Sequence, residues 1–132
     1  MPGLVLDTHA TIWYLEASPK LSATVLNTIR AALNGGDPVH VSTVTVVELT
    51  YLVEKGRFPV ALLDQLLLEL RRANPELLVT PFDLACATSL RTVSSTIRDM
   101  PDRMIAATAV ALGLPLATRD QQIQASGIPV IW

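Results

Sequence analysis

The run Leu4-Val5-Leu6, which stops at Asp7, is the feature that most constrains the fold of this chain. Its uninterrupted apolar side chains are typical of a β-strand that is covered on both faces, as in a parallel sheet flanked by helices. In such sheets ligands bind beyond the carboxyl ends of the strands, so Asp7 is a candidate site residue by position alone. The alternative is that Asp7 only caps a helix that begins near Thr8, because Asp is a preferred N-cap residue.

After Asp7, segments with helical spacing alternate with short apolar segments of strand length. The expected helices cover residues 8–16, 22–34, 43–54, 60–73, 83–94 and 104–112. The further expected strands cover residues 38–42, 77–80, 114–118 and 128–131, the last at a sheet edge. Right-handed crossovers through helices would make these strands parallel. The sequence therefore predicts an α/β fold with a mostly parallel sheet of four to five strands, in a single domain over residues 1–132.

Three acidic residues are expected at the same edge of this sheet. Asp7 follows the first strand, Asp120 follows the strand that ends at Thr118, and Glu48 lies in the helix after the second strand. Asp102 falls in the opening turn of a later helix and joins them only if that helix begins over the site. Each acid also has an ordinary structural explanation: Asp7, Asp102 and Asp120 suit helix starts, and Glu48 could point outward or pair with an arginine.

Taken together, four such explanations would have to coincide at one sheet edge. Clustered carboxylates repel strongly in a low dielectric, and a divalent cation is a common solution. An all-oxygen ligand set favours Mg²⁺ or Mn²⁺ over Zn²⁺, and His9 and His40 lack zinc-like spacing. These residues indicate metal-dependent phosphate chemistry.

Several segments, in this order and spacing, carry a family resemblance that runs through almost the whole chain. They are Leu6-Asp7-Thr8-His9-Ala10 with Trp13, Val41-Ser42 leading to Glu48-Leu49, Gly56-Arg57, the run from Asp102 to Ala109, Thr118-Arg119-Asp120, and the closing Pro129-Val130-Ile131-Trp132. The chain thereby resembles the PIN-domain ribonucleases, specifically the VapC-like toxins of toxin–antitoxin pairs. Two departures are Thr11, at a position that is commonly apolar in the family, and Asp99, a second acid beside Asp102.

The resemblance implies a three-layer sandwich and a Mg²⁺- or Mn²⁺-dependent endoribonuclease that hydrolyses RNA phosphodiesters with a metal-activated water. It implies a catalytic quartet of Asp7, Glu48, Asp102 and Asp120, in which Asp7 and Asp102 are the direct metal ligands and the Thr118 hydroxyl supports the site. It also implies a homodimer and a small cognate VapB-like antitoxin.

Three arginines, Arg98, Arg103 and Arg119, lie near these acids in the sequence. Each has two readings, as a ligand of RNA phosphates or as an ion-pair partner of the acids.

Composition adds limits on location and partners. The net charge of -2 provides no basic footprint for nucleic acid, although several acids gathered in one metal site would leave the remaining surface near neutral. Half of the residues are hydrophobic and the mean hydropathy is +0.41, so we expect a partner or second copy to cover some apolar surface. The leucine-rich helix at residues 60–73 is the candidate for that face, with an ordinary buried helix as the alternative.

The chain has no uncharged apolar run of the roughly 18 to 20 residues that cross a bilayer. It also has no basic residue before its first apolar run, and its lone Cys86 fits a buried hydrophobe. We therefore expect a cytoplasmic protein without a membrane segment.

Two other enzyme or signalling classes and one binding class compete with the nuclease. A haloacid-dehalogenase-like phosphatase needs a second Asp where this chain has His9, and a receiver-type module needs a lysine where Arg119 stands. The non-enzymatic alternative is a catalytically inactive PIN-like binding subunit.

Overall fold

Strand β1 (Leu4–Leu6) runs through the middle of the sheet and is fully buried, in agreement with its apolar sequence. It belongs to a computed structural model that describes residues 3–132; Met1 and Pro2 of the expected domain lie outside the described residues. The side chains of β1 alternate between two hydrophobic cores, with Leu4 and Leu6 in one and Val5 in the other. Burial on both faces explains why this strand lacks polar residues.

The sheet has five strands in the order β3-β2-β1-β4-β5, and every neighbouring pair is parallel. The other strands are β2 (Val39–Ser42), β3 (Leu77–Thr80), β4 (Leu116–Ala117) and β5 (Val130–Ile131). Leu6 pairs with Val41 on one side and with Ala117 on the other. The predicted α/β fold with a largely parallel sheet is confirmed. Because the chain adds β2 and β3 on one side of β1 and β4 and β5 on the other, the strand order reverses beside β1.

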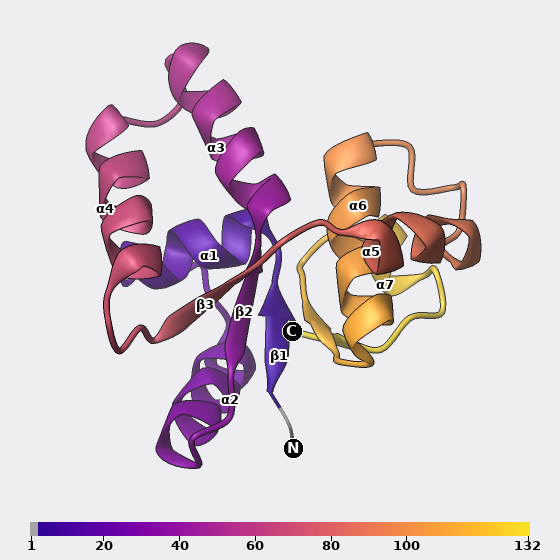
Figure 1. Ribbon diagram of the computed structural model, residues 1–132, viewed down its shortest axis with the longest axis horizontal. Coiled ribbons are helices and arrows are strands. Elements are labelled where there is room, and N and C mark those ends of the chain that lie inside the picture. Colours follow the sequence, from indigo (N-terminus) through magenta and orange to yellow (C-terminus); the bar gives the residue numbers. More distant parts are fainter. Residues whose placement is uncertain (1–2) are drawn as a thin grey trace.

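Helices cover both faces of the sheet (Figure 1). They are α1 (Thr8–Leu15), α2 (Ala23–Asn34), α3 (Thr43–Glu54), α4 (Val60–Arg71), α5 (Leu84–Ser89), the 3-10 helix η1 (Leu90–Thr92), α6 (Met100–Leu112) and α7 (Gln121–Gln124). Residues of α1, α2 and α4 pack with Leu4 and Leu6, whereas residues of α6 and α7 pack with Val5. Helix α3 contributes to both cores, through Leu49 and Val44.

Several element boundaries differ from those expected from the sequence: β5 begins at Val130 and not at residue 128, α4 ends at Arg71 and not at residue 73, and α7 has no counterpart among the expected helices. Three further differences have an evident physical cause. Helix α6 starts at Met100 and not at Met104, because the Asp99 side chain caps it and Pro101 suits its first turn. Helix α5 ends at Ser89 and not near Ser94, because the chain tightens into η1. Strand β4 is shorter than residues 114–118, since the Leu114 N–H donates to the Ala109 carbonyl of α6 and Pro115 has no N–H to donate.

The leucine-rich helix α4 has one face buried in the core of its own domain and also carries an exposed leucine. Leu62 and Leu66 are buried in the core, but the side chain of Leu68 is 70% exposed. Cys86 on α5 is buried, as expected for a small apolar residue. Within residues 3–132, no helix is both long enough and apolar enough to cross a membrane.

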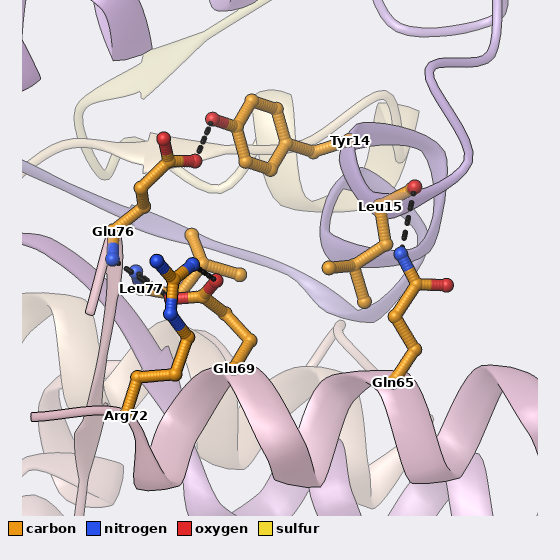
Figure 2. Close-up of polar contacts among 7 residues, drawn as sticks. All are labelled: Tyr14, Leu15, Gln65, Glu69, Arg72, Glu76 and Leu77. Atoms are coloured by element: carbon orange, nitrogen blue, oxygen red, sulfur yellow. Dashed lines mark hydrogen bonds and ion pairs between the residues drawn. The ribbon is translucent and has the colours of Figure 1, made fainter. Parts of the chain in front are cut away.

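A polar network ties α1, α4 and the start of β3 together (Figure 2). The Tyr14 hydroxyl donates to Glu76 at 2.8 Å, and the Gln65 amide donates to the Leu15 carbonyl at the end of α1, at 3.2 Å. Glu69 accepts from the Glu76 N–H at 2.8 Å, and its carboxylate pairs with Arg72 at 2.9 Å. Burial and the Glu76 carboxylate raise the pKa of Tyr14, so its hydroxyl remains a donor to Glu76 even in alkaline solution. This network helps to hold α1 in place at the sheet.

Gly3 enters β1 with a φ of +109°, and a Cβ there would lie 2.0 Å from the Pro38 carbonyl oxygen. We expect Gly3→Ala to lower the free energy of unfolding by about 3 kcal/mol, from backbone strain and this clash together. Gly127→Ala is the matched control, because Gly127 also has a positive φ, +93°, but open space around it. It should cost about 1 kcal/mol. Urea denaturation measures both; equal losses would show that the contact with Pro38 contributes nothing.

Candidate metal centre in an acidic groove

Pairing of β1 with β4 places Asp7 beside Thr118 at the carboxyl edge of the sheet. The Asp7 N–H donates to the Ala117 carbonyl at 3.1 Å, which continues the ladder by one residue. Asp7 is 7% exposed, and its Oδ1 accepts from the Ala10 N–H at 2.8 Å as the cap of α1. Thr11, which stands where the family commonly has an apolar residue, is fully buried. Its hydroxyl donates to the Asp7 carbonyl at 2.8 Å, so this buried polar group has a hydrogen-bond partner.

Two further acids also cap helices next to Asp7. Asp120 accepts from the Gln122 and Ile123 N–H groups at 2.8 and 3.1 Å at the start of α7. Asp99 accepts from the Asp102 N–H at 3.1 Å at the start of α6. Capping and groove lining are therefore compatible, since one carboxylate can satisfy a helix N-terminus while it faces a ligand site.

Glu48 is half-buried on α3 and is held by hydroxyl groups. The Thr8 hydroxyl donates to Glu48 Oε1, and it lies 3.2 Å from the Thr45 hydroxyl. Across residues 3–132 the only ion pair is Arg72–Glu69, so no arginine neutralises Glu48. The Glu48 side chain therefore does not point away from the other acids, and it lines the same groove as they do.

The groove itself has a volume of about 1010 Å³ and brings all four predicted acids together. Figure 1 shows α3 and α6 on opposite sides of the carboxyl end of β1. The acidic residues are Asp7, Glu48, Asp99, Asp102 and Asp120. Apolar, aromatic and basic residues line the rest; they are His9, Trp13, Val47, Tyr51, Leu52, Arg57, Phe58, Pro101 and Arg119.

The tightest group of possible metal ligands consists of Glu48, Asp99 and Asp102. Each offers a carboxylate oxygen, and these oxygens lie within 4.8 Å of one another. Asp99, considered from sequence only as a rival of Asp102, thus stands beside it. Asp7, expected as a direct ligand with Asp102, and Asp120 line the same groove but lie outside this group.

Burial and like charge shift the protonation of this cluster. Desolvation, followed by repulsion from Asp99, Glu48, Asp120 and Asp7, raises the pKa of Asp102 to about 7. Desolvation also raises the pKa of Asp7, against the opposing effects of the Ala10 N–H, the Thr118 hydroxyl and His9. A bound divalent cation would relieve this repulsion, and an all-carboxylate oxygen set suits Mg²⁺ or Mn²⁺.

The three arginines near the acids have different environments. Arg103 donates to the carbonyls of Leu90 and Val93, at 3.1 and 3.3 Å, and so links α6 to η1. Arg98 is exposed and lies outside the groove lining. Arg119 lines the groove, with its guanidinium carbon 4.6 Å from the centre of the Trp13 ring. Within residues 3–132, none of the three forms an ion pair with the acids.

Sequence reasoning missed most of the groove wall outside the acids. His9, whose spacing does not suit a zinc ligand, is exposed in the groove, two residues after Asp7. Tyr51 lies three residues after Glu48 on the same side of α3, a spacing that could have identified it. His40 does have a structural environment, since its Nδ1 lies 2.7 Å from the Thr80 hydroxyl on β3.

Comparisons with known proteins agree with this architecture. The PIN domain family model matches residues 4–127. The chain is 30% identical over 134 residues to Ribonuclease VapC22 of Mycobacterium tuberculosis, in a match that covers 98% of this chain and 95% of the relative.

Solved structures show the same fold. A VapBC2 structure from Rickettsia felis, bound to a DNA fragment from its promoter, has a TM-score of 0.70 at 17% identity and covers 98% of this chain and 97% of that one. A DNA-bound VapBC structure from Salmonella typhimurium has a TM-score of 0.68 at 24% identity, with 99% and 98% covered.

The raised pKa of Asp102 makes the stability of the metal-free protein depend on pH. Between the ordinary carboxyl value of 3.8 and about 7, the folded protein binds more protons at this site than the unfolded chain, so stability falls as pH rises. In EDTA at about pH 8, we expect Asp102→Asn to unfold with about 1 kcal/mol more free energy than wild type, after allowance for solvent screening. This gain should vanish near pH 4.

Thermal unfolding across this pH range measures the effect, with Asp64→Asn, an exposed acid on α4, as the control. A gain for Asp102→Asn that does not change with pH would contradict the electrostatic explanation.

Proposed function

This chain belongs to the PIN-domain family, and on that premise we propose that it is a Mg²⁺- or Mn²⁺-dependent endoribonuclease that acts as the toxin of a toxin–antitoxin module. The relative that is 30% identical over nearly its full length is a ribonuclease, which supports the activity. The observation that carries the proposal is the gathering of five carboxylates, with no paired cation within residues 3–132, in one groove at the carboxyl edge of the sheet.

Asp7 and Asp102 are the residues that we propose as direct metal ligands, with Glu48 and Asp120 completing the catalytic quartet. Asp99 is a further candidate, because its carboxylate approaches those of Glu48 and Asp102. When bound, Mg²⁺ or Mn²⁺ supplies a Lewis acid for the phosphate and lowers the pKa of the attacking water.

The protein's own contribution is to hold charged oxygens in place before the substrate arrives. The Ala10 N–H orients Asp7, the Thr8 hydroxyl orients Glu48, and two N–H groups of α7 orient Asp120. Thr118 supports two of these acids: its hydroxyl favours the ionised form of Asp7 and accepts from the Asp120 N–H at 3.1 Å. Such preorganisation removes the need to rearrange the site during the reaction. Hydrolysis of the RNA backbone would then leave a 5′-phosphate and a 3′-hydroxyl.

The same proposal includes a small VapB-like antitoxin and a homodimer in the cytoplasm. The similar solved structures are described as VapBC complexes, which supports a partner of that kind. Exposed apolar side chains supply surface for such contacts; the most exposed are Val47, Val60, Leu68 and Leu84.

Cleavage of single-stranded RNA in Mn²⁺ tests the activity. We expect the wild-type protein to cleave, and Asp7→Asn and Asp102→Asn each to lower kcat by at least about 100-fold, because each removes charge from the metal centre. EDTA should abolish cleavage by the wild-type protein. Asp64→Asn is the matched control and should retain wild-type activity.

Equal cleavage by all four proteins would point to a contaminating nuclease and contradict the proposed centre. Metal binding by a wild-type protein that cleaves no RNA would instead favour an inactive PIN-like binding subunit.

Light scattering after size exclusion tests the assembly. We expect a mass of two chains for the protein alone, because burial of the exposed apolar side chains favours self-association. A single-chain mass at micromolar concentration would contradict the homodimer and leave the nuclease proposal unaffected.

A further inference from the structure

The guanidinium of Arg119 differs from the other basic groups near the acids in being both exposed and oriented. Arg119 comes directly after Thr118 at the carboxyl end of β4 and lines the acidic groove. Its guanidinium carbon lies 4.6 Å from the centre of the Trp13 ring, within the range of a cation–π contact. An arginine that is stacked in this way loses less conformational freedom when its planar guanidinium donates to two oxygens of a phosphate.

Trp13 provides a rigid platform for this contact. Its side chain is 7% exposed, and it packs in the core beside Leu4 and Leu6. The His9 ring lies 5.5 Å from one side of Trp13, and the Trp132 ring meets it edge-on at 5.8 Å. These contacts hold the Trp13 ring in place, and the ring in turn orients the guanidinium of Arg119.

The acids beside Arg119 leave its charge available. The nearest in sequence, Asp120, uses its Oδ1 to accept from the Gln122 and Ile123 N–H groups. Across residues 3–132, no carboxylate lies within ion-pair distance of Arg119. The N–H donors of the Arg119 guanidinium therefore remain available to an anion that enters the groove.

A cation such as Arg119 would favour the binding of RNA in this groove. Metal ions would neutralise the charge at the scissile phosphate, but the neighbouring phosphates would still be repelled by the carboxylates of the groove. The groove also carries aromatic surface at which unpaired bases can stack, because the side chain of Tyr51 is 55% exposed and His9 is exposed. These features suit a single strand better than a duplex, whose bases are already stacked.

We propose that Arg119 binds a phosphate of single-stranded RNA next to the scissile one, and that Trp13 is a positioning residue that orients its guanidinium. This inference rests on the proposed nuclease function. Of the three arginines near the acids, we thus assign phosphate binding, and not ion pairing with the acids, to Arg119 alone.

Steady-state cleavage of a short single-stranded RNA in Mn²⁺ is the first test. Arg119→Ala should raise KM about tenfold with kcat nearly unchanged, because it removes a charge-assisted contact made to bound substrate. Arg119→Lys should show a smaller increase, since lysine keeps the charge but not the planar fork. The matched control is Arg71→Ala, an exposed arginine at the end of α4 remote from Phe58, the groove residue that precedes this helix.

Trp13 is tested by the split between KM and kcat. Trp13→Phe keeps an aromatic face and should stay close to wild type, whereas Trp13→Leu should raise KM and spare kcat. Because Trp13 is buried, thermal unfolding of both variants checks the fold; if Trp13→Leu does not fold, the Arg119→Lys and Trp13→Phe results decide.

RNA binding without cleavage separates this inference from the proposed activity. In an Asp7→Asn background, fluorescence anisotropy of a labelled single-stranded RNA over increasing KCl should show a salt slope that is smaller by about 0.7 when Arg119 is replaced by Ala. The slope for Arg71→Ala should not change.

If wild-type protein cleaves RNA but Arg119→Ala matches Arg71→Ala in KM and salt slope, this inference is overturned and the nuclease proposal stands. If wild-type protein does not cleave, the nuclease proposal fails and the salt slope still decides the role of Arg119.

Discussion

Mutual repulsion of carboxylates that the fold does not allow to separate is the constraint on which this structure depends. Parallel pairing of β1 with β4 puts Asp7 at the point where the strand order reverses. Helix starts bring Asp99 and Asp120 to the same groove, each tied to backbone N–H groups. Because these anchors are part of the secondary structure, the carboxylates of Asp99 and Asp120 cannot turn away from the groove without loss of a helix cap. Desolvation, and after it the repulsion from the other acids, raise the pKa of Asp102 to about 7, and a bound divalent cation would offset the repulsion.

The groove combines this acidic centre with a wall of different chemistry. Trp13 joins the hydrophobic core to the groove, and it carries Arg119 on its face. The polar network of Tyr14, Gln65, Glu69 and Glu76 holds the helix from which Trp13 projects (Figure 2). Contacts that stabilise α1 therefore also fix the position of Trp13 in the groove. In the proposed function, metal ions at the acidic centre and the guanidinium of Arg119 would offset the negative charge of neighbouring RNA phosphates.

Much of the site can be predicted from the sequence, but helix capping and groove lining are not exclusive roles for an acid. Helix capping and ligand binding were weighed against each other for Asp7 and Asp120, yet both carboxylates cap helices and line the groove. For Glu48, the apolar residues Val44 and Leu52 one turn away on its helix favour partial burial, but they do not reveal the Thr8 hydroxyl that donates to it. That contact joins residues forty positions apart, which no local pattern encodes.

By itself the sequence determined the alternation of strands and helices, the parallel sheet and the three acids expected at its edge, because apolar periodicity and strand ends are local properties of the chain. Only the tertiary structure decided that α6 starts early enough to bring Asp99 beside Asp102, and that Arg119 lies on Trp13 while Arg103 bonds to backbone carbonyls. These outcomes depend on which distant segments pack together. The chemistry of an arginine allows either contact, and tertiary packing decides which neighbour is within reach.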